Sequence, residues 1–211
     1  MSADQLIIFD CDGVLVDSEP IANAVFAQHL TEIGLPTTPA QAIEQFKGRS
    51  LKSALEMVAQ DLGRPVPATF LDEMQAQTYR QFRTQLNAVD GAEDLVKWAQ
   101  GQGFRTCIAS SGDYEKMDVT LGLTGLKRYF ERRIFSSLEV KRGKPAPDLF
   151  LYAAQKMGVL PAKCTVIEDS QAGVDAALAA GMRVFAYGDF PAAPGVVPVS
   201  RLVEIRAALS L

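Results

Sequence analysis

The chain has 211 residues, 48% of them hydrophobic and 22% charged, with a formal net charge of −4. These values exclude a disordered chain and are typical of a folded protein with at least one substantial core. The mildly acidic balance does not favour nucleic-acid binding, and no apolar run approaches the roughly 20 residues of a membrane span. Because the first residues show no basic stretch followed by an apolar run, we expect a cytoplasmic protein.

Short apolar runs predict buried strands that are separated by helical patterns. The first run, residues 5–10, is nearly continuous and ends in Asp10, as is typical of a central strand covered on both faces. Further strand-like runs cover residues 105–110, 133–137, 164–169 and 183–187, and helical patterns cover residues 92–100, 115–121, 147–157 and 172–180. This alternation predicts an α/β fold with a Rossmann-like parallel sheet and helices on both of its faces. Residues 191–195 are expected to form a loop before a short last helix.

A long stretch after the first strand interrupts this alternation with helical patterns alone. Leu55, Val58 and Leu62 lie on one face of a predicted helix, which Gly63 ends. No convincing strand occurs until the chain returns to the alternating pattern. We therefore expect a small all-helical cap domain at residues 17–88, inserted into a core domain made of residues 1–16 and 89–211.

Polar side chains stand where the predicted strands end. In an open parallel sheet, ligands bind beyond the carboxyl ends of the strands. We therefore expect these side chains, and the lysine in the loop after the third strand, to converge at one edge of the sheet. They are Asp10 with Asp12, Ser110 with Ser111, Ser136 with Ser137, Lys144, and Glu168 with Asp169.

The charges of this group indicate a metal ion. Asp10 and Asp12 are two residues apart at a strand end, a spacing that places both carboxyl groups on the same side. If Glu168 and Asp169 join them, four carboxylates face one nearby cation, Lys144. Such a cluster would repel both itself and an anionic substrate unless a divalent cation were bound, and ligation by oxygen alone favours magnesium.

The same residue types can carry out phosphoryl transfer. A carboxylate such as Asp10 can attack phosphorus and form an aspartyl-phosphate. Ser110 can donate its hydroxyl group to a phosphate oxygen, and Lys144 offers a point charge to the same group. Asp12 can protonate the leaving oxygen and then accept a proton from the hydrolytic water. Each motif alone has an ordinary explanation as a turn or a helix cap, so the joint pattern is what indicates a site.

In that order along the chain, the motifs resemble those of the haloacid dehalogenase superfamily. The segment Asp10–Glu19 resembles its first motif, Ser110 its second, Lys144–Asp148 its third, and Ile167–Ser170 with Ala172–Gly173 its fourth. The resemblance covers essentially the whole chain. The helical insert is similar to the small cap of the beta-phosphoglucomutase-like phosphatases, and the sequence at its start is most similar to the 6-phosphogluconate phosphatase branch.

This resemblance implies a role for each matching residue. Asp10 would be the nucleophile and Asp12 the general acid and base, while Ser110, with Ser111 beside it, and Lys144 would hold the phosphoryl group. Asp12 would also offer its main-chain carbonyl to the metal. The magnesium ligands implied by the resemblance are Asp10, Asp12, Glu168 and Asp169.

The cap would choose the substrate and close over the site. The loop around Lys47, Gly48 and Arg49 is our expected substrate contact, because the two basic side chains can pair with a sugar carboxylate or a second phosphate. A basic turn at the start of a helix explains the same loop equally well. Glu19, at the end of the first motif, is a further candidate.

Two sequence features narrow the reaction. Members of the superfamily that cleave carbon–halogen or phosphonate bonds lack an acid two residues after the nucleophile, so Asp12 indicates phosphate ester chemistry. The mutases carry a histidine early in the first cap helix, whereas His29 lies about two turns too late. We therefore predict a magnesium-dependent phosphatase acting on a sugar phosphate or a sugar-acid phosphate such as 6-phosphogluconate.

Two alternatives remain open at this point. A phosphosugar mutase would share the whole core, and a phosphate-binding or receiver-like module would share the acids, the serine, the lysine and the metal. Receiver domains place their phosphorylated aspartate at a later strand, where this chain has Ser110. As partners we expect a small phosphorylated metabolite and neither nucleic acid nor membrane, in a monomer or small homo-oligomer.

Overall fold

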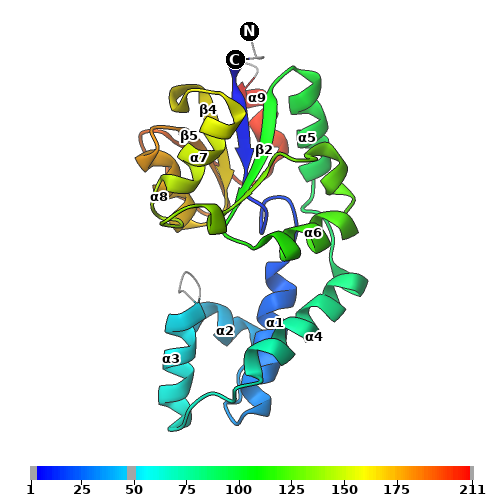
Figure 1. The fold of residues 1–211 in the computed structure, drawn as a ribbon, viewed down its shortest axis with the longest axis vertical. Coiled ribbons are helices and arrows are strands. Elements are labelled where there is room, and N and C mark those ends of the chain that lie inside the picture. The colour runs from blue at the N-terminus through cyan, green and yellow to red at the C-terminus, as the bar shows by residue number, and fades with distance from the viewer. Residues whose placement is uncertain (1–3, 47–50, 210–211) are drawn as a thin grey trace. The chain divides into compact units, whose positions relative to one another are not determined.

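The computed structural model describes residues 4–46 and 51–209, with the backbone alone for residues 51 and 52. The chain divides into two compact units (Figure 1). We call Met1–Asp17 with Asn87–Leu211 the core unit, and Ser18–Leu86 the helical unit. In the described part of the chain, no helix is long and apolar enough to cross a membrane.

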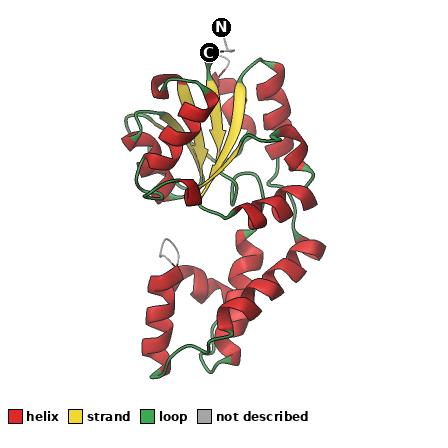
Figure 2. Ribbon diagram, in the orientation of Figure 1, coloured by secondary structure: helices red, strands yellow, loops and turns green. Residues whose placement is uncertain are grey.

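A six-stranded parallel sheet forms the centre of the core unit (Figure 2). Its strand order is β3-β2-β1-β4-β5-β6, so the first strand of the chain lies between the second and the fourth. The strands are β1 (Leu6–Phe9), β2 (Arg105–Ser110), β3 (Ile134–Ser136), β4 (Cys164–Glu168), β5 (Arg183–Tyr187) and β6 (Val196–Val199). The α/β fold class, with a helical insertion after the first strand, is confirmed.

The edge strand β6 was not expected from the sequence. Its residues Val196–Val199 follow the loop predicted at 191–195, where only a helix was expected. Pro198 lies within it and pairs in register with Ala186 of β5. A proline has no N–H group to donate to a ladder, so it is tolerated on an edge strand but counts against a strand when the sequence is read alone.

Helices cover both faces of the sheet. On one face, α7 (Asp148–Met157) packs against β1 and β2, and α8 (Gln171–Ala179) packs against β4 and β5. Alternate residues of β1, Leu6 and Ile8, belong to the core cluster on this face. On the other face, α5 (Ala92–Gly101) packs against β2 and against α9 (Val203–Leu209) (Figure 1). The remaining elements are α6 (Tyr114–Leu123) and the short 3-10 helices η2 (Leu126–Tyr129), η3 (Ser137–Glu139) and η4 (Pro161–Lys163).

The helical unit has a small apolar core of its own. It consists of α1 (Glu19–Glu32), α2 (Pro39–Phe46), α3 (Leu51–Leu62) and α4 (Phe70–Gln85). The buried side chains of Leu30, Val58 and Phe70 form its centre, and the predicted stripe on α3 packs there through Leu55 and Leu62. The described residues of the insert contain helices and no strand. The helical spacing of apolar residues in the sequence therefore predicted its secondary structure correctly.

His29 belongs to this helical core. The residue is buried, its Nε2 atom lies 3.0 Å from Gln77 Oε1, and its ring meets the Phe70 ring edge-on at 5.8 Å between centroids. These contacts explain its burial by packing within the helical unit.

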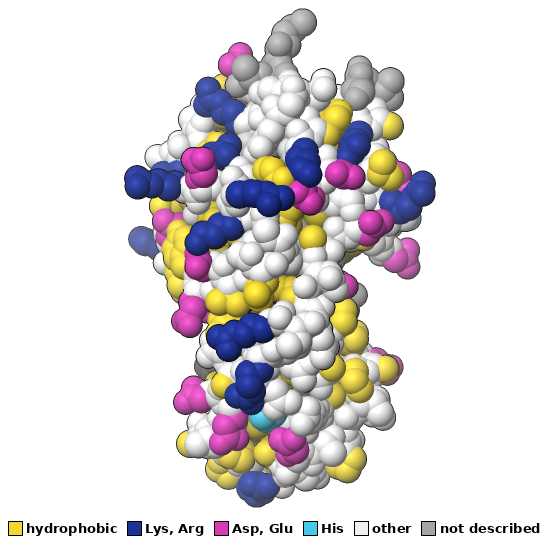
Figure 3. Space-filling view, turned by 90° about the vertical axis from the view of Figure 1, so that its right-hand side faces the viewer, with side chains coloured by type: hydrophobic (Ala, Val, Ile, Leu, Met, Phe, Trp, Pro, Cys, Tyr) yellow, Lys and Arg dark blue, Asp and Glu magenta, His cyan; other side chains and the backbone are white. Residues whose placement is uncertain are grey.

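Charged side chains of both signs share the molecular surface. On the face shown in Figure 3, lysine and arginine side chains are interspersed with aspartate and glutamate side chains, and the described residues visible there form no single basic patch. A phosphate backbone is held by concentrated positive charge, and this face does not supply it.

Candidate active site

The register of the sheet brings the carboxyl ends of β2, β1 and β4 together. Phe9, the last residue of β1, is level with Ile108 of β2 and with Ile167 of β4. The next residue, Asp10, continues the ladder by donating its main-chain N–H to the carbonyl oxygen of Ile167 at 2.9 Å. Asp10 therefore lies beside Glu168 at the end of β4, with the end of β2 on its other side.

Lys144 links the nucleophile candidate to β4. Its Nζ atom donates to Asp10 Oδ1 at 2.5 Å and to Glu168 Oε2 at 3.3 Å. All three side chains are less than a tenth exposed, and the ammonium group also lies 5.0 Å from the centre of the Phe150 ring. Burial disfavours the charge of Lys144, but attraction by Asp10 and Glu168 outweighs this and raises its pKa, so the lysine is a permanent cation here.

Glu168 is held in place from its other side by the start of α8. Ser170 donates its hydroxyl group to Glu168 Oε1 at 2.5 Å and accepts the main-chain N–H of Gly173 at 3.1 Å, so it also caps the helix. The Glu168 carboxylate lies directly against Gly173. A Cβ atom built on Gly173 would come within 1.9 Å of Glu168 Oε1, a distance that no real contact allows.

Gly173→Ala should therefore destabilise the chain and disturb the site. We expect the free energy of unfolding to fall by about 1–3 kcal/mol, because the Glu168 carboxylate is buried and must move, and phosphate release to fall with it. Gly122→Ala in α6 is the matched control, since nothing lies within 4 Å of its added Cβ and helix propensity predicts a gain of about 0.5–1 kcal/mol. Urea unfolding of both variants measures the difference, and an equal or larger loss in Gly122→Ala would contradict this packing explanation.

Asp169 joins Asp10 and Glu168 in a cluster that could hold a cation. Each of the three residues offers one oxygen, and these atoms lie within 4.8 Å of one another. The turn after Asp10 is built tightly against Asp169. Gly13 has a φ of +76°, and a Cβ atom there would lie 2.0 Å from Asp169 Oδ2, so both backbone conformation and space require glycine.

The electrostatics of this cluster agree with a bound cation. Burial, reinforced by the negative charge of Glu168, raises the pKa of Asp10 to about 7, although Lys144 opposes the shift. Three carboxylates thus lie close together in a poorly solvated place, and Lys144 contacts two of them, Asp10 and Glu168. An all-oxygen donor set with an excess of negative charge is the kind that Mg²⁺ prefers, so the residues present fit this ion.

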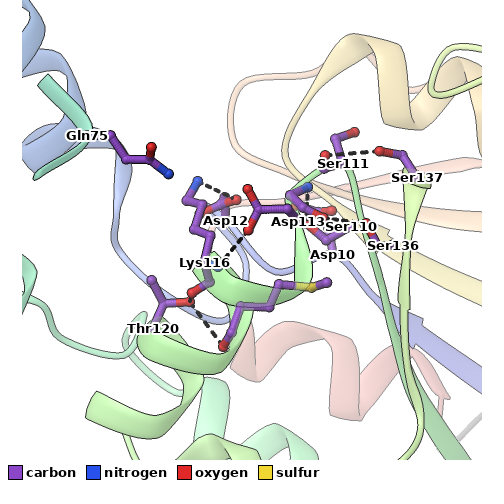
Figure 4. A network of polar contacts seen from close by, with 12 residues as sticks. Asp10, Asp12, Gln75, Ser110, Ser111, Asp113, Lys116, Thr120, Ser136 and Ser137 are labelled. Carbon is purple, nitrogen blue, oxygen red and sulfur yellow. Dashed lines mark hydrogen bonds and ion pairs between the residues drawn. The ribbon is translucent and has the colours of Figure 1, made fainter. Parts of the chain in front are cut away.

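The loop after β2 is fixed by hydrogen bonds to the end of β3 (Figure 4). Ser136 donates to the carbonyl oxygen of Gly112 at 2.7 Å, and Ser137 donates to that of Ser111 at 3.0 Å. The fully buried Ser110 accepts the N–H of Gly112 at 3.0 Å. Ser136 and Ser137, expected among the strand-end groups, thus hold the backbone of the loop that carries Ser110. The Ser111 residue is exposed.

The haloacid dehalogenase-like hydrolase family matches residues 5–181, which include all of these motifs. The chain belongs to this family. The resemblance noted in the sequence is thereby confirmed.

Individual members of the family align over nearly the whole chain. The 6-phosphogluconate phosphatase of Escherichia coli K12 is 32% identical over 188 residues, which are 89% of this chain and 84% of that protein. Hexitol phosphatase A of the same organism is 31% identical over 206 residues, with coverages of 96% and 88%. A haloacid dehalogenase family hydrolase from Deinococcus radiodurans, solved with bound phosphate and sodium, is 31% identical with a TM-score of 0.81, covering 100% of this chain and 96% of that one.

In this haloacid dehalogenase-like chain, the structure adds one residue that the sequence analysis overlooked. Lys116, in the first turn of α6, places its Nζ atom 2.8 Å from Asp12 Oδ2 (Figure 4). Burial disfavours the charge of Lys116, but attraction by Asp12 outweighs this effect and raises the pKa of the lysine. The sequence contained a signal for this residue. Asp113, three residues after Ser110, is a typical helix N-cap residue, and a helix that begins there has Lys116 in its first turn.

Of the expected cap residues, the structure describes only Glu19. It is exposed, begins α1 of the helical unit, and accepts a hydrogen bond from Asn23 Nδ2 at its main-chain oxygen at 2.9 Å. Lys47, Gly48 and Arg49 lie outside the described residues. Their roles in substrate binding, like the catalytic and metal-binding roles of the core residues, stay predictions.

Proposed function

We propose that this chain is a magnesium-dependent phosphatase of small phosphorylated metabolites that works through an aspartyl-phosphate on Asp10. The observation that carries the proposal is the placement of Asp10. It is a buried carboxylate held by Lys144 and grouped with Glu168 and Asp169 at the carboxyl ends of the strands. Phosphoryl transfer to a carboxylate requires a nucleophile, positive charge and oxygen ligands for a metal ion in one place.

In the first half-reaction, a carboxylate oxygen of Asp10 attacks the phosphorus atom of the substrate. The bond between phosphorus and the ester oxygen breaks, and the leaving oxygen takes a proton from the carboxyl group of Asp12. Lys144 and the hydroxyl group of Ser110 hold the phosphoryl oxygens. The products of this step are the free alcohol and a phosphorylated Asp10.

In the second half-reaction, water attacks the phosphorus atom of the aspartyl-phosphate. Asp12, now a carboxylate, accepts a proton from that water, and the bond between phosphorus and the Asp10 oxygen breaks. Asp10 returns to its original state and inorganic phosphate leaves. The proton that Asp12 gave to the leaving group is replaced in this step, so the cycle balances.

The carboxylates of Asp10 and Asp169 and the main-chain carbonyl of Asp12 would hold Mg²⁺, with Glu168 as a ligand or as support. When bound, the ion supplies positive charge that offsets the carboxylates and the negatively charged phosphoryl group. Lys144 alone cannot do this, because it already serves two carboxylates.

The proposed substrate class is sugar phosphates and sugar-acid phosphates, including 6-phosphogluconate. It is supported by the names of the two related E. coli phosphatases, which align over most of this chain. We propose that the helical unit selects among these substrates, with the segment containing Lys47 and Arg49 as the candidate contact for a carboxylate or a second phosphate.

The test is phosphate release from a panel of sugar phosphates in the presence of Mg²⁺. The panel includes 6-phosphogluconate, fructose 1-phosphate, a hexitol phosphate and beta-glucose 1-phosphate. Selective release from one or a few of these compounds is the expected result. No release from any of them, combined with isomerisation of a hexose phosphate once a bisphosphate is added, would instead establish the mutase alternative.

A further inference from the structure

Two lysines in the core unit each contact a different aspartate of the first motif. Lys144 contacts Asp10, whereas Lys116 contacts Asp12, with 2.8 Å between Lys116 Nζ and Asp12 Oδ2. The Lys144 pair is almost fully buried, while the side chains of Lys116 and Asp12 are 31% and 22% exposed. The second pair is therefore the more exposed of the two.

The loop that follows Ser110 leads into α6 and positions Lys116 near Ser110 and Asp12. Asp113 caps α6 by accepting the main-chain N–H of Lys116 at 2.7 Å, which fixes the first turn of the helix. Gly112 marks the meeting point of the groups. A Cβ atom placed there would lie 3.4 Å from Ser110 Oγ, 3.7 Å from Asp12 Oδ2 and 3.8 Å from Lys116 Cδ. The candidate phosphate ligand, the candidate acid and the second lysine thus surround one small residue.

An aspartate needs help to present one particular oxygen. The last torsion of an aspartate side chain is broad and roughly two-fold, so the carboxyl group has little preference of its own for either orientation. Lys116 binds Oδ2 and thereby restricts this rotation. The carboxyl group is thereby held in one orientation for its proposed exchange of a proton with the leaving group and with water.

We propose that Lys116 is a positioning residue that orients the Asp12 carboxyl group for proton transfer. The inference rests on the proposed function, in which Asp12 is the general acid and base. Lys116 acts through Asp12 rather than on the phosphoryl group, so its removal should slow the steps that need a proton and spare those that do not.

The test compares two aryl phosphates that differ in how much proton donation their leaving groups need. p-Nitrophenolate is a stabilised anion and leaves without a proton, whereas phenolate benefits from one. For Lys116→Met we expect kcat with phenyl phosphate to fall by about 10²-fold, at the lower end of what general acid–base catalysis contributes. With p-nitrophenyl phosphate, the initial burst of nitrophenolate should stay close to the wild-type rate while steady turnover slows, because hydrolysis of the aspartyl-phosphate still needs Asp12.

Three further variants separate positioning from other roles. Lys116→Arg keeps a cation near Asp12 and should recover part of the lost kcat. Lys97→Met removes a lysine with the same 2.8 Å separation from a carboxylate, Glu93, on α5, and should leave both substrates unaffected. In an Asp12→Asn background, Lys116→Met should cause no further loss, because residues that act as a unit are not additive.

Two results would overturn the inference while leaving the proposed function intact. One is a rise in KM of the same size for both substrates with kcat unchanged, which would make Lys116 a substrate ligand. Another is an equal loss from Lys116→Met in the wild-type and Asp12→Asn backgrounds. Failure of the wild-type chain to release phosphate from both aryl phosphates and from every sugar phosphate of the panel would instead count against the proposed function, and the inference would fall with it.

Discussion

Asp10→Asn is expected to lower the kcat of phosphate release by roughly 10⁴-fold or more, the scale on which removal of a covalent nucleophile acts. The amide has the same shape but cannot attack phosphorus. It also leaves Lys144 with only Glu168 as a charged partner among the described residues. Steady-state phosphate release with p-nitrophenyl phosphate and with the best sugar phosphate measures the effect.

The control for this substitution is Asp94→Asn. Asp94 is exposed in the first turn of α5, so the change of charge is the same but the site is untouched. We expect wild-type turnover from this variant. Turnover by Asp10→Asn within a few-fold of the control would remove Asp10 from the role of nucleophile and require another group in its place.

Removal of Mg²⁺ with a chelator is expected to lower turnover by about 10²-fold or more, since charge stabilisation by a metal ion contributes several kcal/mol to such reactions. Excess Mg²⁺ should restore the activity. The same ion should raise the melting temperature of the wild-type chain, because binding to the folded state alone stabilises it by about 2.7 kcal/mol when the concentration is 100 times the Kd. This second readout does not depend on catalysis.

Asp169→Asn tests whether the carboxylate cluster is the metal site. It should weaken both the activation and the shift in melting temperature, because it removes one of the three carboxylates that lie within 4.8 Å of one another. Asp175→Asn, an exposed position on α8, should respond to Mg²⁺ as the wild-type chain does. A melting temperature that rises equally in both variants would place the ion elsewhere.

Much of the fold could be predicted because the sheet is parallel and buried. Central strands covered on both faces appear as continuous apolar runs, and β1 with Asp10 at its end is the clearest case. The same topology brings the carboxyl ends of neighbouring strands to one edge. Asp10, Lys144 and Glu168, which are far apart in the sequence, could therefore be grouped before any contact between them was known.

The features that the sequence could not predict depend on individual contacts. The edge strand β6 contains Pro198, which locally disfavours a strand, and it is recognised as a strand by its pairing with β5. The partner of Asp12 depends on where the first turn of α6 directs Lys116, and this follows from the cap at Asp113. The support of the Ser110 loop by Ser136 requires two strands in register. None of these contacts produces a recognisable pattern or residue spacing in the sequence.

The central claim is a covalent phosphate on Asp10, and the most direct measurement is to trap it. The wild-type chain would be quenched with acid during turnover, treated with borohydride, which reduces an acyl phosphate to an alcohol, and digested for mass spectrometry. We predict that the peptide spanning β1 and its following turn carries a homoserine at position 10, only when substrate and Mg²⁺ are both present. A phosphorylated or reduced residue at another position, or an unmodified peptide during active turnover, would contradict the account.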